Sequence, residues 1–294
     1  MKLEGVFVPN VTPFDRDGEI EREALMGLIE FWVGPGVSGL VVNASTGEGP
    51  ILSREEKAGL IELIRERSDR RTKVIAGTGA ISTRETIELT KDARDLGAEA
   101  VLVTTPFFYR PSDEELFQHY ASLVASVDMP VILYNVPKFT RYSISPRVVE
   151  RIAGECSGLV GIKDSSNNPG TIAEILRLVG DRISVLAGAA DVALPTLSMG
   201  GKGAILPVAN AIPRICVALY RAAKRGDLEE AGRLQLRVSH VNNVLVREHS
   251  QVAAVKLALN LMEHPAGVTR RPLMPLPEGE ELEVRKALKA IGLL

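Results

Sequence analysis

Cysteine, aromatic residues and net charge are all scarce in this 294-residue chain. The two cysteines, Cys156 and Cys216, lie far apart and show no metal-ligand spacing, which predicts free thiols in a reducing, cytoplasmic compartment. A formal net charge of −2 provides no general attraction to nucleic acid or to an anionic membrane surface. No apolar run approaches the roughly 20 residues that span a bilayer. These absences favour a protein that binds small molecules through local groups.

Short strand-like runs alternate with helical patterns through most of the chain. We expect strands at 5–11, 39–44, 73–77, 100–104, 130–135, 159–163, 183–187 and 203–208. Capping-box signals at Ser53, Ser82 and Ser112 mark the starts of intervening helices. Eight such units in roughly 225 residues predict a (β/α)8 TIM barrel rather than an open doubly wound sheet. The first strand is not followed by Gly-x-Gly-x-x-Gly, which argues against dinucleotide binding.

The strand pattern stops after Gly226. Helical patterns follow at 227–246, 251–262 and 278–291. We therefore expect a catalytic barrel over residues 1–226 and a small C-terminal helical domain over residues 227–294.

The sixth strand-like run ends in a lysine, Lys163. Regular alternation would place this side chain on the same side as Gly161 and Leu159, with space beneath its stem at the glycine. Apolar neighbours would cost an ammonium its hydration and favour the free amine, which attacks a carbonyl to form a Schiff base. For this stretch alone, a lysine that pairs with a carboxylate or extends into water is the more ordinary interpretation.

Other polar residues fall at the same end of the predicted barrel, where TIM-barrel active sites lie. Tyr134 ends the fifth strand, Ser45-Thr46-Gly47 follows the second, and Gly188 follows the seventh. Hydroxyl and backbone N–H groups of the Ser-Thr-Gly loop could hold the carboxylate of a 2-oxo acid. The Tyr134 phenol could transfer protons, with Ser45 as a relay. These separate signals at one rim favour chemistry over the ordinary interpretation of each.

Each of these residues also has a structural interpretation. The Ser-Thr-Gly stretch could be an ordinary loop, and Tyr134 an interior tyrosine with a bonded hydroxyl. We expect Glu48 to pair with a basic neighbour or with loop amides. We predict neither a metal nor a cofactor, and we expect packing or surface roles for the four histidines, which are His119, His240, His249 and His264.

Five motifs spread over nearly the whole length carry a family resemblance. They are Val8-Pro9-Asn10-Val11-Thr12-Pro13-Phe14, Ser45-Thr46-Gly47-Glu48, Thr105-Pro106-Phe107-Phe108-Tyr109, Tyr134-Asn135-Val136-Pro137 and Gly161-Ile162-Lys163-Asp164. With these motifs the chain resembles the family of N-acetylneuraminate lyases and dihydrodipicolinate synthases, which also contains 2-keto-3-deoxygluconate aldolases.

The resemblance implies a barrel enzyme that binds pyruvate covalently and is commonly tetrameric. By position, Lys163 would form the Schiff base, Tyr134 would transfer protons, and Ser45 and Thr46 would hold the pyruvate carboxylate. The expected partners are pyruvate, a small aldehyde or sugar-acid substrate, and further copies of the chain in a dimer or tetramer. The remaining residues that we assign to substrate binding are Gly47, Phe139, Gly188 and Leu206.

Departures from the family pattern bear on the second substrate. Synthases of this family carry an arginine two residues after the proline of Tyr-Asn-x-Pro, where this chain has Phe139, and Arg141 is off register. A tyrosine that often reaches across a subunit interface is replaced by Phe108, which Tyr109 follows.

These departures rank the functional hypotheses. The leading one is a pyruvate-dependent class I aldolase acting on a 2-keto-3-deoxy sugar acid. The alternatives are dihydrodipicolinate synthase, which condenses pyruvate with aspartate semialdehyde using Arg141 or another cation, and a non-catalytic 2-oxo acid sensor.

Overall fold

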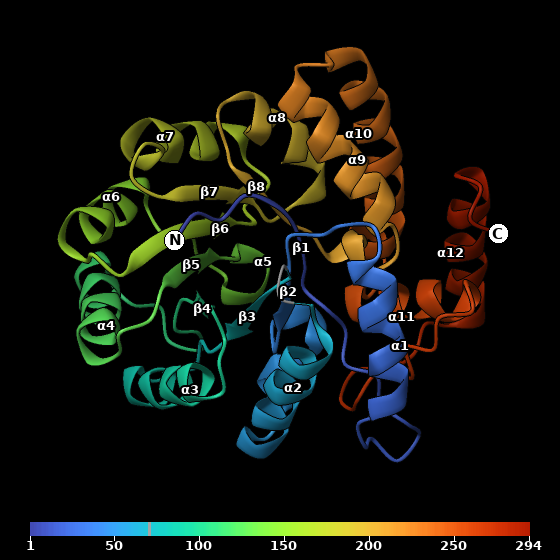
Figure 1. Ribbon diagram of the computed structural model, residues 1–294, viewed down its shortest axis with the longest axis horizontal. Coiled ribbons are helices and arrows are strands. Elements are labelled where there is room, and N and C mark those ends of the chain that lie inside the picture. Colours follow the sequence, from blue (N-terminus) through green and yellow to red (C-terminus); the bar gives the residue numbers. More distant parts are fainter. Residues whose placement is uncertain (70–71) are drawn as a thin grey trace.

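Eight parallel strands close into a barrel in the order of the chain, which confirms the predicted fold class (Figure 1). The structure is a computed structural model and describes residues 1–69 and 72–294. The strands are β1 (Gly5–Val8), β2 (Gly39–Val42), β3 (Lys73–Gly77), β4 (Ala100–Thr104), β5 (Val131–Asn135), β6 (Leu159–Asp164), β7 (Ser184–Ala187) and β8 (Gly203–Ile205). Each matches a predicted strand, although β1, β2 and β8 end earlier than expected.

Helices form the outer layer, and several begin where the sequence signals predict. Ser53 and Ser112 form complete capping boxes, whereas Ser82 accepts a bond from the Glu85 amide without the reciprocal bond. The helices are α1 (Arg22–Val33), α2 (Arg54–Arg67), α3 (Thr83–Asp95), α4 (Asp113–Ser126), α5 (Pro137–Thr140), α6 (Pro146–Glu155), α7 (Pro169–Val179), α8 (Ala193–Ser198), α9 (Pro213–Arg225), α10 (Leu228–Asn242), α11 (Gln251–Leu261) and α12 (Glu278–Ala290).

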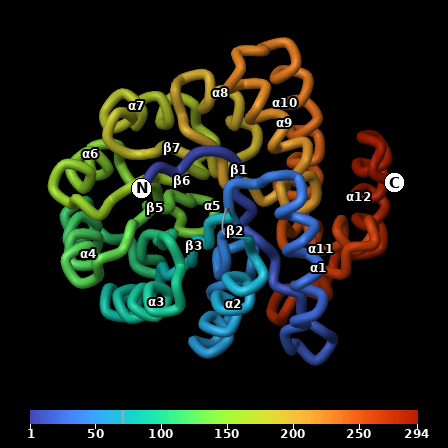
Figure 2. The backbone as a smooth tube through the Cα atoms, in the orientation of Figure 1, coloured from blue at the N-terminus to red at the C-terminus, as the bar shows by residue number. Residues whose placement is uncertain are grey.

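The C-terminal helices continue the outer layer. Buried side chains of α10, α11 and α12 belong to the same cluster as those that join the barrel to its surrounding helices. Figure 2 shows the chain ending on α12 at the edge of the molecule. A short π-helix, η5 (Asn243–Glu248), separates α10 from α11 where we expected one uninterrupted helix to residue 246.

A bulge in β6 corrects one expectation about Lys163. Leu159 pairs with Val131 but Gly161 pairs with Ile132, so Val160 is an extra residue in β6. The extra residue reverses the alternation, and Leu159 packs in the outer cluster rather than beside Lys163. A Cβ atom on Gly161 would lie 3.2 Å from Leu3, which belongs to the cluster inside the barrel, so the space beneath the lysine is already occupied.

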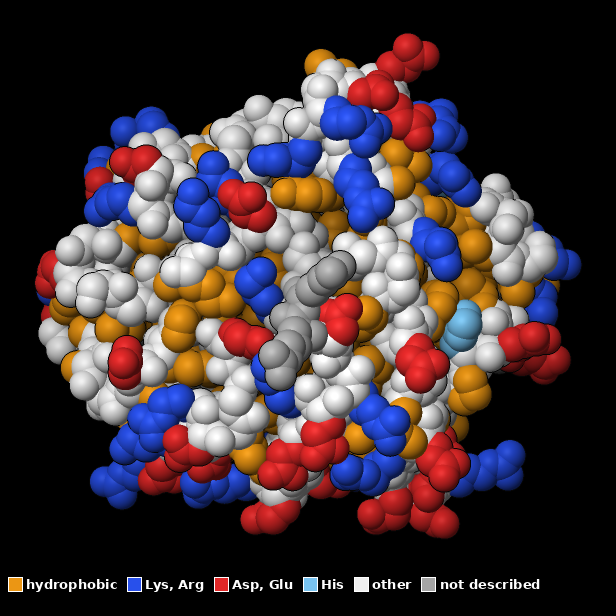
Figure 3. Space-filling view, in the orientation of Figure 1, with side chains coloured by type: hydrophobic (Ala, Val, Ile, Leu, Met, Phe, Trp, Pro, Cys, Tyr) orange, Lys and Arg blue, Asp and Glu red, His pale blue; other side chains and the backbone are white. Residues whose placement is uncertain are grey.

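The surface is mixed in charge. Acidic and basic side chains alternate over the face shown in Figure 3, as the small net charge suggests. In the described part of the chain, every helix is too short or too polar to cross a bilayer. Both cysteines are buried and free, as predicted.

The barrel closes between β8 and β1 through a pair of facing glycines. Gly203 is the register partner of Gly5, and a Cβ atom on Gly203 would lie 2.1 Å from the Gly5 carbonyl oxygen. The two backbones can approach this closely only because a side chain is missing.

Replacing Gly203 by alanine should therefore lower the free energy of unfolding by about 1–3 kcal/mol, as overpacking does in other cores. Gly232→Ala is the matched control, because this helical glycine in α10 has open space around it. The control should raise the free energy of unfolding by about 0.5–1 kcal/mol. Urea denaturation measures both, and equal stability of the Gly203→Ala and wild-type proteins would contradict the prediction.

Candidate active site

Lys163 is fully buried at the C-terminal end of β6, and its amine is unpaired. Its Nζ atom has no hydrogen-bond partner among the described residues and lies 4.1 Å from the centroid of the Tyr134 ring. Tyr134 is its register neighbour on β5, so the two strands hold the side chains together. A buried amine without a partner is costly to keep in a fold, which makes such a group a candidate for function.

A second hydroxyl lies within reach of the Tyr134 phenol. The Oγ atom of Ser45 is 3.3 Å from the phenol oxygen, and either group can donate. Ser45 begins the 3-10 turn η1 (Ser45–Gly47), which directly follows β2. The structure thus brings together Lys163, Tyr134 and Ser45, the three residues predicted to be catalytic.

The turn that carries Ser45 is fixed from both sides. Thr46 is buried, and its hydroxyl accepts a hydrogen bond of 3.1 Å from the Gln251 amide of α11. The carbonyl oxygen of Gly47 accepts a bond of 2.7 Å from the Thr12 hydroxyl. A Cβ atom on Gly47 would lie 2.7 Å from the Asn10 carbonyl oxygen, so this close approach requires glycine.

Glu48 follows the turn and forms a buried ion pair. Its Oε1 atom lies 2.6 Å from Nζ of Lys256 on α11, and both side chains are almost completely buried. Its Oε2 atom accepts a bond of 2.9 Å from the Arg270 amide. Burial lowers the pKa of Lys256 to about 8, although the charge of Glu48 opposes this shift. The structural role expected for Glu48 is confirmed.

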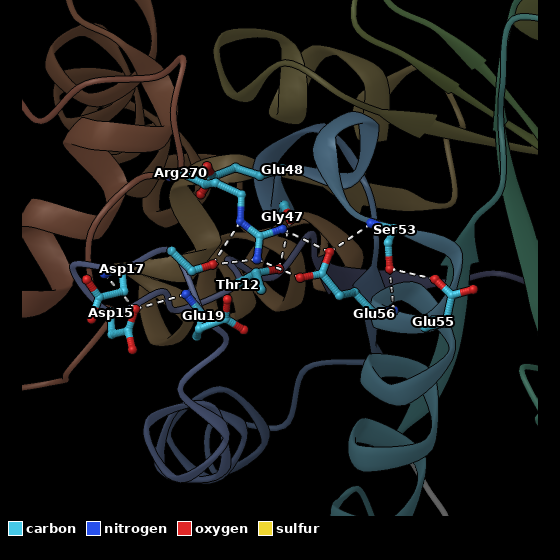
Figure 4. A network of polar contacts seen from close by, with 11 residues as sticks. Thr12, Asp15, Asp17, Glu19, Gly47, Glu48, Ser53, Glu55, Glu56 and Arg270 are labelled. Carbon is cyan, nitrogen blue, oxygen red and sulfur yellow. Dashed lines mark hydrogen bonds and ion pairs between the residues drawn. The ribbon is translucent and has the colours of Figure 1, made fainter.

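Arg270 extends this network to the start of α2. Its guanidinium group forms bonds of 2.9 and 2.6 Å to the two carboxylate oxygens of Glu56 and also donates to the Gly18 carbonyl (Figure 4). The same group lies 4.2 Å from the centroid of the Phe14 ring. The C-terminal segment therefore holds the turn after β2, together with the loop after β1, in one position.

A cavity of about 460 Å³ opens at this rim. Its lining includes Ser45, Tyr134 and Phe139, and the C-terminal segment closes one side. Tyr134 therefore connects the cavity to Lys163, because it lines the cavity and also contacts the lysine amine. The other predicted site residues lie outside the lining of this cavity, and they are Thr46, Gly47, Lys163, Gly188 and Leu206.

Gly188 and Leu206 occupy packed positions. Gly188 lies against the strand end that follows Lys163, because a Cβ atom there would meet Ser165 and Asp164 at 2.0 and 2.9 Å. Leu206 is buried in the outer cluster, so its side chain faces away from the barrel interior. Only the backbone of these two residues lies at the end of the barrel that carries the cavity.

His249 and Lys138 are two of the cavity-wall residues to which the sequence analysis gave no role at the site. His249 lies between two carboxylates of α12, with Nδ1 3.2 Å from Glu280 and Nε2 2.9 Å from Glu283. Lys138 follows Pro137 in the short helix α5, which we did not predict from the sequence. Proline after a strand could have indicated such a turn, whereas the partners of His249 are distant in the sequence.

The loop after β4 carries two exposed aromatic rings. Phe108 is 84% exposed and Tyr109 is 75% exposed, and their centroids are 5.1 Å apart. Phe108 has a positive φ of 80°, which is unusual for a bulky residue. Neither ring lines the cavity, whereas Phe107 does.

A (β/α)8 barrel with an unpaired interior lysine beside a tyrosine–serine pair defines an enzyme of the class I aldolase type, which works through a Schiff base. The chain belongs to the dihydrodipicolinate synthetase family, whose family model matches residues 2–291. Membership in this family of enzymes removes the support for a non-catalytic sensor.

Individual relatives match over their whole length. The chain is 38% identical to a 4-hydroxy-tetrahydrodipicolinate synthase from Geobacter sp. (strain M21), covering 99% of this chain and 100% of the relative. A solved dihydrodipicolinate synthase from Thermotoga maritima is 33% identical with a TM-score of 0.97, covering 100% of both chains. A dihydrodipicolinate synthase from Acinetobacter baumannii, solved in complex with pyruvate, is 34% identical with a TM-score of 0.96 and the same coverage.

The buried pair of Glu48 and Lys256 leads to a test of stability. Lys256→Met should lower the free energy of unfolding by about 3–5 kcal/mol, because it leaves the carboxylate of Glu48 buried without its cation. Adding Glu48→Gln should recover most of this loss, since the charge is then removed as well. Urea denaturation of the two single variants and the double variant gives the coupling.

The exposed pair of Glu230 and Arg233 on α10 is the matched control. Arg233→Met should leave the free energy of unfolding nearly unchanged, because water and salt screen an exposed ion pair. A double variant as unstable as the sum of its two single variants would show that Glu48 and Lys256 are not coupled.

Proposed function

We propose that this enzyme condenses pyruvate with aspartate semialdehyde, as a 4-hydroxy-tetrahydrodipicolinate synthase. The observation that carries the reaction type is the buried, unpaired amine of Lys163 beside Tyr134 and Ser45. The choice of aldehyde is supported by relatives that carry this name and that match the chain over nearly their whole length. This ranking reverses the one drawn from the sequence.

In the proposed mechanism, the Lys163 amine attacks the C2 carbonyl of pyruvate. Loss of water gives an imine, and loss of a proton from C3 gives an enamine that attacks the aldehyde carbon. The amino group of the aldehyde substrate then displaces Lys163 from the imine carbon, which closes the ring and frees the lysine amine. Tyr134 and Ser45 transfer the protons that leave nitrogen and reach oxygen in these steps. Ser45 and Thr46 hold the carboxylate of pyruvate. The pyruvate found in the related Acinetobacter structure supports this first substrate.

The sugar-acid hypothesis is the second candidate, and Phe139 is the observation in its favour. This side chain lines the cavity and is 47% exposed. It occupies the position at which synthases of the family carry an arginine. Arg141 does not compensate directly, because it is exposed and lies outside the cavity lining. Both candidates use the same lysine chemistry and differ only in the aldehyde.

The role of Lys163 is tested by trapping. Incubation with pyruvate and borohydride should give a stable adduct, and peptide mass spectrometry should place it on Lys163. Lys163→Ala should give no adduct, whereas Tyr134→Phe should keep the fold and slow turnover by about 10²–10⁴-fold. Lys91→Ala, at an exposed position on α3, is the control and should be trapped like the wild type. An adduct on a different lysine would overturn the assignment.

The identity of the aldehyde is tested by competition between acceptors. With saturating pyruvate, kcat/KM for aspartate semialdehyde should exceed that for glyceraldehyde, the acceptor of a sugar-acid aldolase, by at least about 100-fold. Product formation measured by mass spectrometry gives both rates, and Lys163→Ala provides the background. A higher value for glyceraldehyde would reject the synthase and establish the sugar-acid activity instead.

A further inference from the structure

The cavity wall contains few positive charges. Among the described residues that line it, the cationic side chains are Lys57 and Lys138, and arginine is absent. The third basic residue, His249, is already held by Glu280 and Glu283. The carboxylate of Glu48 is likewise held by Lys256 and Arg270. A negatively charged substrate that enters this cavity therefore meets two lysines whose ammonium groups form no ion pair in the described structure.

The surroundings distinguish these two lysines. Lys57 lies near Glu85 and Glu56, whose charges raise its pKa while burial lowers it more. For Lys138 the charge interaction comes from the Tyr134 phenol, and burial again lowers the pKa. The Nζ atom of Lys138 donates one bond of 2.9 Å to the Val246 carbonyl, which leaves two N–H groups of the ammonium for other acceptors.

Position in the chain also favours Lys138. It is the second residue of α5, the short turn that follows β5 and begins at Pro137. Tyr134 lies on β5, the strand that leads directly into this turn, so Lys138 is close in the chain to the residue whose ring contacts Lys163. Phe139 follows it and offers an apolar wall, while Arg141 ends the turn in the left-handed conformation, with a φ of 65°, outside the cavity lining.

We propose that Lys138 binds the carboxylate of the aldehyde substrate and thereby selects a charged acceptor in the absence of an arginine at position 139. The inference rests on the proposed function and names the residue that recognises its second substrate. The ammonium is anchored by the Val246 carbonyl, forms no ion pair with a carboxylate of the described residues, and lies at the same rim as the Tyr134 phenol. A carboxylate at this place would form charge-assisted hydrogen bonds in a partly dehydrated cavity.

Lys138→Gln is the variant that tests this proposal. Glutamine can still donate to the Val246 carbonyl, so the turn is preserved while the charge is lost. The KM for aspartate semialdehyde should rise by about 10-fold to 100-fold, the effect expected when a charged hydrogen-bond partner is removed. The KM for pyruvate and the rate of borohydride trapping should stay within twofold of the wild type. Lys138→Arg should restore most of the affinity, and Lys91→Gln is the matched surface control.

A binding measurement separates failure of this inference from failure of the proposed function. Calorimetry with aspartate semialdehyde in the Lys163→Ala background, where the Schiff base cannot form, reports acceptor binding without turnover. Binding should be at least 10-fold weaker in the Lys163→Ala/Lys138→Gln protein. Absence of product from the wild type would reject the synthase, whereas equal binding by these two proteins, or none by either, would reject the role of Lys138. An equal rise in KM for pyruvate and for the aldehyde would also overturn it.

Discussion

The burial of one amine without a hydrogen-bond partner among the described residues is the constraint on which the rest of the structure depends. Lys163 reaches the interior because the bulge at Val160 reverses the alternation of β6, and Leu3 fills the space beneath it. The Nζ atom of Lys163 lies over the ring of Tyr134. This amine has no hydrogen-bond partner among the described residues, so it is available to form a covalent bond with a carbonyl.

The opposite wall of the site depends on a different kind of interaction. Ser45, Thr46 and Gly47 lie on a turn that would have several conformations if it were held only by β2. Glu48 anchors the turn to α11 through Lys256, and Arg270 carries the connection on to α2. Because these charges are buried and paired, the turn cannot move without breaking several bonds together. The lysine is thus held by β6, whereas the turn proposed to bind the carboxylate is held by the ion pairs of Glu48 and Arg270. The two meet at one rim of the barrel.

The parts of the fold and site that could be predicted from the sequence are those that depend on local patterns. The eight strands, the caps at Ser53 and Ser112 and the meeting of Lys163, Tyr134 and Ser45 follow from alternation and from the geometry of parallel barrels. The bulge, the partners of Glu48 and the contacts of His249 depend on residues far apart in the chain, which no periodicity reveals.

The choice of aldehyde could not be predicted for a related reason. The sequence draws attention to the missing arginine at Phe139, whereas Lys138, the cation that lines the cavity, attracts attention only once α5 is seen. The dimer or tetramer, and the division between residues 226 and 227, stay predictions.

The long connection from Glu48 to Arg270 also sets an order of events during translation. All eight strands of the barrel have been made once Ile205 is added, so the sheet can close while the last part of the chain is still missing. The turn after β2 acquires its anchor only when Lys256 and Arg270 have followed. Until Lys256 and Arg270 have been added, a growing chain lacks the anchors of this turn, so its catalytic rim can be completed only near the end of synthesis.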